Sequence, residues 1–149
     1  MQTTAAIDAE YEAGIKLYDE GAPLSDVLVH FERLKDAAPT DVRVAVSLSW
    51  LYILAGDRAQ ALTYCRQVRG TAQGRFNQVL AYLEFGEKGV REKFEEAVSS
   101  GGHEGIHDAI ANLQDAIKRK GGSFPAAQKM LRWLAEVHPE HDRGESPPD

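Results

Sequence analysis

Apolar residues recur at intervals of three and four along the first half of the chain, which is the period of an amphipathic α-helix. No stretch alternates apolar and polar residues for long enough to predict a strand. Turn-forming residues interrupt the helical pattern at "GAP" (21–23), "AAPTD" (37–41), "AGD" (55–57) and Gly70. The pattern therefore predicts four helices, over about 5–20, 23–37, 41–54 and 58–69.

The second half of the chain continues the same pattern less regularly. Four further helices are expected around Phe76–Leu83, Val90–Val98, Ile106–Ile117 and Ala127–Val137, with breaks near Gly86, at "SSGGHEG" and at "KGG". The segment 139–149 is rich in charge and proline, and we expect it to be disordered. The chain is thus predicted to be all-α, with about eight helices arranged as consecutive antiparallel hairpins.

A repeat of about 34 residues underlies these hairpins. Shifting the first hairpin by that length places Tyr18 on Tyr52, turn on turn, and small or large apolar residues on core positions. The second unit resembles a tetratricopeptide repeat, through Leu48, Tyr52, Gly56-Asp57, Ala61-Leu62 and Val68. On this resemblance, residues 1–138 form one repeat domain with units of about 8–41, 42–75, 76–106 (degenerate) and 107–141.

The resemblance implies a right-handed superhelix of helix-turn-helix hairpins whose first helices line a concave face that binds peptides or partner proteins. In the second unit, the residues beside the core positions are expected to face this groove. Trp50 has two open interpretations, as an aromatic anchor for a partner or as a packing residue against a neighbouring hairpin. The predicted partner-binding residues are Arg43, Val46, Trp50, Ile53, Leu54, Phe76, Asn77 and Leu80.

The expected groove is apolar, which favours an apolar or amphipathic partner segment. Glu12 and Trp50 stand where repeats that clamp acidic chaperone tails need a cation and an amide, so that function is disfavoured. We expect an adaptor, a scaffold subunit or a dedicated chaperone, and the size and fold also suit a secretion-system type chaperone. A second copy of the chain, giving a homodimer, or the chain's own termini are alternative occupants of the groove.

The stretch "GGHEGIHDAI" (101–110) contains the zinc-protease pattern H-E-x-x-H at His103, Glu104 and His107. In that class of enzyme, two histidines one helical turn apart bind zinc and the glutamate acts as a base. Here the pattern spans a predicted helix start, lacks an evident third ligand and has no strand to hold a substrate. A zinc-dependent hydrolase is therefore only an alternative from another class. A metal site that joins His103 and His107 to His138 and His141 is weighed against ordinary surface histidines.

Composition and net charge argue against several other classes of function. The net charge of −6 argues against nucleic-acid binding, and no apolar run reaches the length that spans a bilayer. No signal peptide is visible and the chain has a single cysteine, so a cytoplasmic location is expected. Residues 1–40 carry eight acidic and three basic side chains, whereas 58–83 carry four arginines and no acid before Glu84. We expect no cofactor and no catalytic activity.

Overall fold

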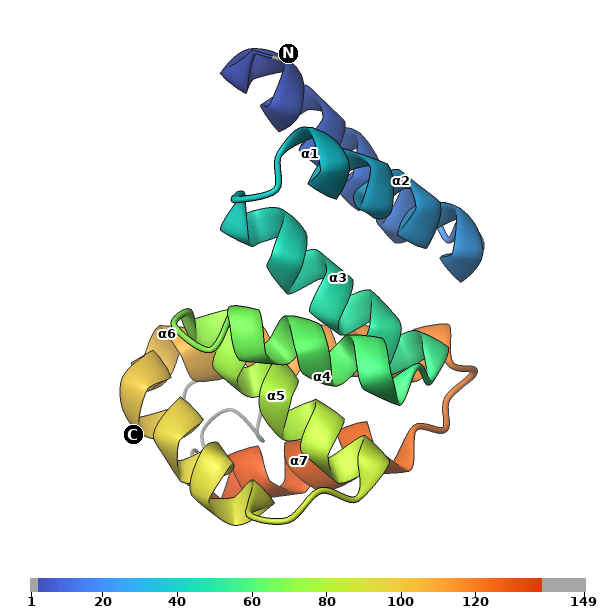
Figure 1. Ribbon diagram of the computed structural model, residues 1–149. Coiled ribbons are helices and arrows are strands. Elements are labelled where there is room, and N and C mark those ends of the chain that lie inside the picture. The colour runs from blue at the N-terminus through green and yellow to red at the C-terminus, as the bar shows by residue number, and fades with distance from the viewer. Residues whose placement is uncertain (1–2, 138–149) are drawn as a thin grey trace, which may run out of the picture. The chain divides into compact units, whose positions relative to one another are not determined.

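The computed structural model describes residues 3–137, which are helical throughout apart from short connections (Figure 1). The predicted all-α class is confirmed, since the described residues contain helices and no strand. His138 and the expected disordered tail over 139–149, which contains His141, lie outside the described residues. The helices are α1 (Thr4–Asp19), α2 (Leu24–Ala37), α3 (Val42–Ala55), α4 (Arg58–Gln67), α5 (Ala72–Phe85), α6 (Val90–Arg119) and α7 (Pro125–Val137).

The described residues form seven helices, not eight, because the break expected at "SSGGHEG" is a kink inside α6. Gly102 alone leaves the helical conformation there, with φ 66° and ψ −165°. A positive φ costs glycine little, so one residue redirects the chain without a separate loop. The two predicted helices therefore exist on either side of the kink but follow each other directly.

Local sequence accounts for where the other helices begin and end. Asp41 begins α3 by accepting a hydrogen bond from the backbone N–H of Arg43 at 3.0 Å. Thr71 begins α5 in the same way, with its hydroxyl 2.9 Å from the N–H of Gly74. Gly56 ends α3 in the left-handed conformation that glycine adopts most readily. Asp41 is therefore the N-cap of the third helix.

The chain divides into two compact units, which contain the described residues 3–70 and 71–137. In the first unit, each helix packs on the next along the chain, so that α2 contacts both α1 and α3. In the second unit, α5, α6 and α7 all pack on one another. The hairpins expected over 8–41 and 42–75 correspond approximately to α1–α2 and α3–α4.

One cluster of buried side chains holds the first unit together. Val27, Phe31 and Leu34 of α2 lie at its centre and are almost fully inaccessible to solvent. The cluster also contains buried residues of α1, α3 and α4. It therefore joins these three helices to α2. Its other buried members are Ile7, Val44, Leu48, Leu51 and Tyr64.

Helices α1 and α2 approach each other closely at Gly14. A Cβ atom added at Gly14 would lie 2.6 Å from Cζ of Phe31 and 2.7 Å from Cδ2 of His30. Phe31 is 1% exposed and its ring also meets Tyr11 edge-on, with centroids 6.1 Å apart. The ring therefore has little room to move, and the contact requires a residue without a side chain.

We predict that Gly14→Ala destabilises the protein even though alanine favours a helix by about 1 kcal/mol over glycine. The clash with Phe31 is expected to cost about 1–3 kcal/mol, as overpacked cores do. Gly105→Ala is the matched control, because its Cβ would lie 3.5 Å from Cε2 of Phe76, an ordinary contact. Chemical denaturation of both variants checks the prediction, and a stabilised Gly14→Ala protein would contradict it.

Candidate functional site

Side chains of α1 and α3 pair at both ends of the two helices. Near their starts, Nη2 of Arg43 lies 2.9 Å from Oδ1 of Asp8. Near their ends, the indole N–H of Trp50 donates a hydrogen bond to the hydroxyl of Tyr18 at 3.0 Å. The N-terminal part of α1 contacts the N-terminal part of α3, and the C-terminal parts of the two helices also contact each other. Helices α1 and α3 therefore run in the same direction. The paired residues are 35 and 32 positions apart in the sequence.

Arg43 is held in one orientation by two carboxylates and a ring. Its Nε and Nη2 donate to the two carboxylate oxygens of Asp41 at 3.1 and 2.8 Å. Its guanidinium also lies over the ring of Tyr11, 4.6 Å from the centroid. The hydrogen bond from the Arg43 side chain lowers the pKa of Asp41, and the same contact raises the pKa of Arg43. The guanidinium therefore stays charged and fixed.

We call Tyr11, Tyr18, Arg43, Val46 and Trp50 the α1–α3 face. All five side chains are partly exposed. Arg43, Val46 and Trp50 fall within about 60° of one another around an ideal helix, so they form one stripe along α3. Trp50 contacts the neighbouring hairpin through Tyr18 and also retains exposed surface. The packing interpretation of Trp50 is therefore confirmed, and its role as a partner anchor stays a prediction.

The other five predicted binding residues are buried, which corrects the expectation that they line an open groove. Ile53 and Leu80 are 0% exposed, Asn77 1%, Phe76 2% and Leu54 6%. Side chains with so little accessible surface present almost nothing to a peptide. A helix that is apolar nearly all round needs to be covered on more than one side. For α3 and α5, which carry these five residues, the chain itself provides this cover.

In the second compact unit, residues 71–137, helix α5 shows the physical reason for this burial. Every side chain from Phe76 to Ala81 is buried, so this part of the helix has no open apolar face. A Cβ added at Gly101 of α6 would lie 2.9 Å from the ring of Phe76, which shows how closely the two helices pack. The side-chain amide of Asn112 donates to Gln73 at 2.9 Å, and Gln73 donates to Asn77 at 2.6 Å. This amide chain satisfies polar groups in a buried setting.

The H-E-x-x-H residues lie on α6 immediately after its kink. His103, Glu104 and His107 are all exposed, whereas Gly101 and Gly105 face the ring of Phe76. Among residues 3–137, no group of three or more histidine, cysteine, aspartate or glutamate side chains could hold a metal ion. The pattern therefore lies on a helix, as a zinc site requires, but brings together only part of a ligand set. The contributions expected from His138 and His141 lie outside the described residues.

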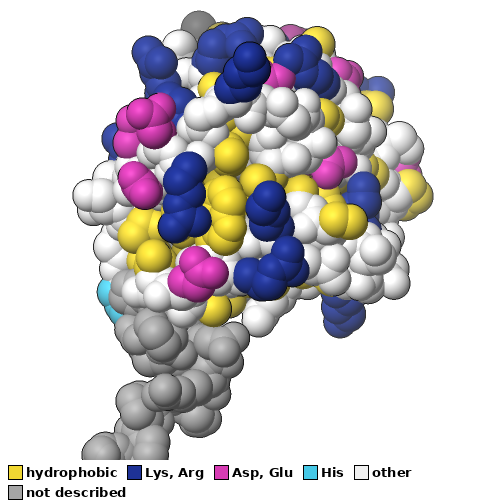
Figure 2. Space-filling model, turned by 90° about the horizontal axis from the view of Figure 1, so that it is seen from below, with side chains coloured by type: hydrophobic (Ala, Val, Ile, Leu, Met, Phe, Trp, Pro, Cys, Tyr) yellow, Lys and Arg dark blue, Asp and Glu magenta, His cyan; other side chains and the backbone are white. Residues whose placement is uncertain are grey.

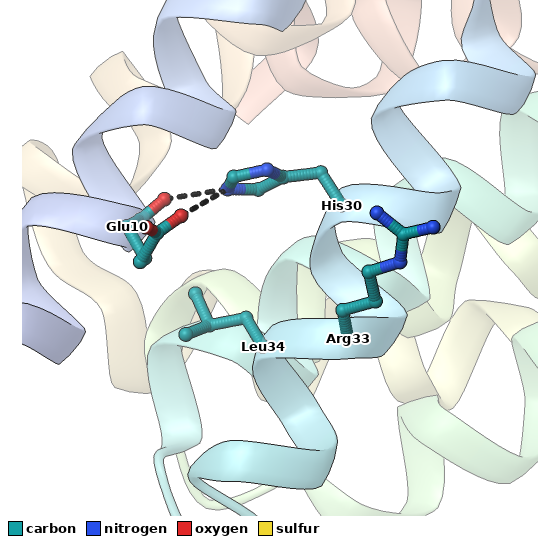
Figure 3. Close-up of a pocket in the computed structure, with 4 residues that line it drawn as sticks. All are labelled: Glu10, His30, Arg33 and Leu34. Atoms are coloured by element: carbon teal, nitrogen blue, oxygen red, sulfur yellow. Dashed lines mark hydrogen bonds and ion pairs between the residues drawn. The ribbon is translucent and has the colours of Figure 1, made fainter. Parts of the chain in front are cut away.

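A small pocket in the first unit, which the sequence reasoning did not anticipate, is lined by Glu10, His30, Arg33 and Leu34 (Figure 3). Nε2 of His30 donates to the backbone carbonyl oxygen of Glu10 at 2.7 Å and lies 3.7 Å from its carboxylate. Because a carbonyl oxygen only accepts hydrogen bonds, this nitrogen is the donor. Sequence gives no signal for the pocket, since the key acceptor is a main-chain atom.

Two groups that could act as nucleophiles are held protonated. Burial raises the pKa of the Cys65 thiol to about 12. Burial, reinforced by a hydrogen bond to Glu32, also raises the pKa of Tyr52. Both environments disfavour the ionised form that nucleophilic catalysis needs.

Cations also cover aromatic rings in the second unit. The guanidinium of Arg91 lies 4.7 Å from the centroid of Trp133, and Nζ of Lys129 lies 5.6 Å from it. One face of the molecule shows apolar side chains lying between Lys and Arg side chains (Figure 2). Arg91 is also within 3.8 Å of the Glu95 carboxylate, so its charge is partly compensated.

Comparison with known proteins finds no match: no family model, no curated protein and no solved structure is similar to this chain. The tetratricopeptide resemblance therefore rests on the sequence pattern of residues 42–75. None of the helices in the described part of the chain is long and apolar enough to cross a bilayer.

We predict that Asp41→Ala destabilises the protein by about 1 kcal/mol at neutral pH, as the loss of a helix cap does. The folded-state pKa of Asp41 is lowered, so its stabilising contribution is present above the unfolded pKa of about 4 and is lost as pH falls through the folded value. The difference between Asp41→Ala and the parent should therefore narrow below about pH 4. Urea titrations at several pH values measure this difference.

The control for this prediction is the same comparison in an Arg43→Gln background. Without the guanidinium, the main cause of the lowered pKa of Asp41 is gone. The pH dependence of the Asp41→Ala effect should then be smaller. An effect that is independent of pH in both backgrounds would contradict the assignment.

Proposed function

We propose that this protein is a non-catalytic protein-interaction module, built as a tetratricopeptide-like helical repeat, which binds a segment of a partner protein on the α1–α3 face. The observation that carries the proposal is the spacing of the two side-chain pairs between α1 and α3. Their separations of 35 and 32 residues lie on either side of the 34-residue shift found in the sequence. Successive repeats of that length would bring equivalent positions of their first helices side by side in this way.

The chemistry of the α1–α3 face supports a binding role. Aromatic side chains and arginine contribute disproportionately to protein interfaces, and Tyr18, Arg43 and Trp50 are of these types. Each is already oriented by a hydrogen bond within the chain. A side chain that is fixed before binding loses less conformational freedom when a partner arrives. The face therefore offers anchors at low entropic cost.

The biological setting of the module is part of the proposal. An adaptor, a scaffold subunit, a dedicated chaperone and a secretion-system type chaperone all need such a face. A cytoplasmic location is proposed on the basis of the single, buried Cys65. The zinc-dependent hydrolase receives no comparable support, since His103, Glu104 and His107 gather no further ligand among the described residues.

Val46→Asp tests the face directly, because it places a carboxylate between Arg43 and Trp50 on the stripe of α3. Val29→Asp is the matched control, since Val29 is a helical valine that is 48% exposed on α2, outside the face. The wild type and both variants are immobilised, exposed to a native extract, and the captured proteins are quantified by mass spectrometry. Circular dichroism establishes that each variant is folded.

The expected result is a partner that the wild type and Val29→Asp capture equally and that Val46→Asp loses by about tenfold or more, as loss of a central interface contact allows. A folded Val46→Asp protein that retains every partner of the wild type would contradict the proposal. Loss of the partner in both variants would place the binding surface elsewhere.

A further inference from the structure

A stripe of carboxylates follows α1 along the edge of the α1–α3 face. Asp8, Glu12 and Asp19 fall within about 40° of one another around an ideal helix. All three are exposed, and Asp8 is the one that reaches across to Arg43. The stripe therefore runs beside the side of α1 that faces α3.

Two of these carboxylates lie outside the ion pairs of the described residues. Glu12 and Asp19 form no ion pair or hydrogen bond within residues 3–137. The nearest lysine on the same helix, Lys16, lies 4.0 Å from Glu20 instead. The cation on the face, Arg43, is already bound by Asp8 and Asp41. An approaching partner therefore meets apolar and aromatic surface with negative charge along one edge.

The N-terminal part of the chain around this stripe also has a net negative charge. Residues 1–40 carry eight acidic and three basic side chains. Like charges repel at close range, whereas opposite charges speed association and fix orientation. An acidic partner segment is therefore disfavoured here, and a basic one is favoured.

We propose that the α1–α3 face binds a basic amphipathic helix of a partner protein. This inference rests on the proposed function and specifies the chemistry of the partner. The apolar side of the helix covers Val46 and Trp50, and its lysine or arginine side chains reach Glu12 and Asp19. A helix suits the site because α1 and α3 run in the same direction, and a third helix placed along them contacts both over its length.

The probe is a designed peptide of about 15–20 residues, long enough to form a helix, made of leucine and lysine at helical spacing. Two matched peptides replace every lysine by glutamine or by glutamate. Fluorescence anisotropy of the labelled peptides measures their affinity for the full chain. Increasing salt should weaken binding of the lysine peptide, because exposed charges are screened.

Two double variants separate the effect of charges at the α1–α3 face from the effect of the protein's net charge. Glu12→Lys/Asp19→Lys reverses the charges at the edge of the face, whereas Asp26→Lys/Asp36→Lys makes the same change in net charge on α2. We expect the first double variant to lower the affinity for the lysine peptide by roughly tenfold and the second by about twofold or less. Thermal melting shows whether each variant folds, and the single changes Glu12→Gln and Asp19→Asn replace the first if it does not.

The outcomes distinguish this inference from the proposed function. Equal binding of the glutamine or glutamate peptide, still lost in Val46→Asp, would overturn the basic-partner inference and leave the binding face intact. Equal losses in the two double variants would also overturn it, by attributing the effect to net charge. Lysine-peptide binding that is unchanged in Val46→Asp and in Glu12→Lys/Asp19→Lys would overturn both.

Discussion

Helix α2 has to be covered by apolar side chains from two directions, and the arrangement of the first unit depends on this requirement. Val27, Phe31 and Leu34 are nearly inaccessible, and α2 packs on both α1 and α3. Gly14 lets α1 approach the ring of Phe31 on one side, while Leu48 and Val44 of α3 join the same cluster. Helices α1 and α3 also contact each other through side chains, with Tyr18 bonded to Trp50 and Asp8 to Arg43.

Local signals in the sequence predict the helices of the first unit well. Apolar spacing and the turns at 37–41 and 55–57 are short-range features that the fold uses as expected, and the structure adds the caps at Asp41 and Asp57 and the left-handed Gly56. The kink at Gly102 was not predictable in the same way. Two adjacent glycines permit a loop or a one-residue kink equally, and the choice depends on how α6 packs against Phe76.

The candidate site was predicted only in part, because periodicity identifies the apolar sides of a helix but not what covers each of them. Arg43, Val46 and Trp50 lie on a partly exposed face, whereas Ile53 and Leu80 are enclosed. The sequence of α5 is misleading in this respect, since Asn77 and Gln78 interrupt its apolar run and are nevertheless buried. In the stretch that carries the H-E-x-x-H match, Gly101 allows the close contact of α6 with the ring of Phe76.

The most direct test of this account is an NMR measurement of contacts between α1 and α3 in the intact protein. Nuclear Overhauser effects should connect the indole N–H of Trp50 to the ring of Tyr18, and the side chain of Arg43 to the ring of Tyr11. Both sets of contacts are expected, because the parallel alignment of the two helices requires both ends to meet. A folded protein that shows neither contact would contradict the alignment, and with it the binding face.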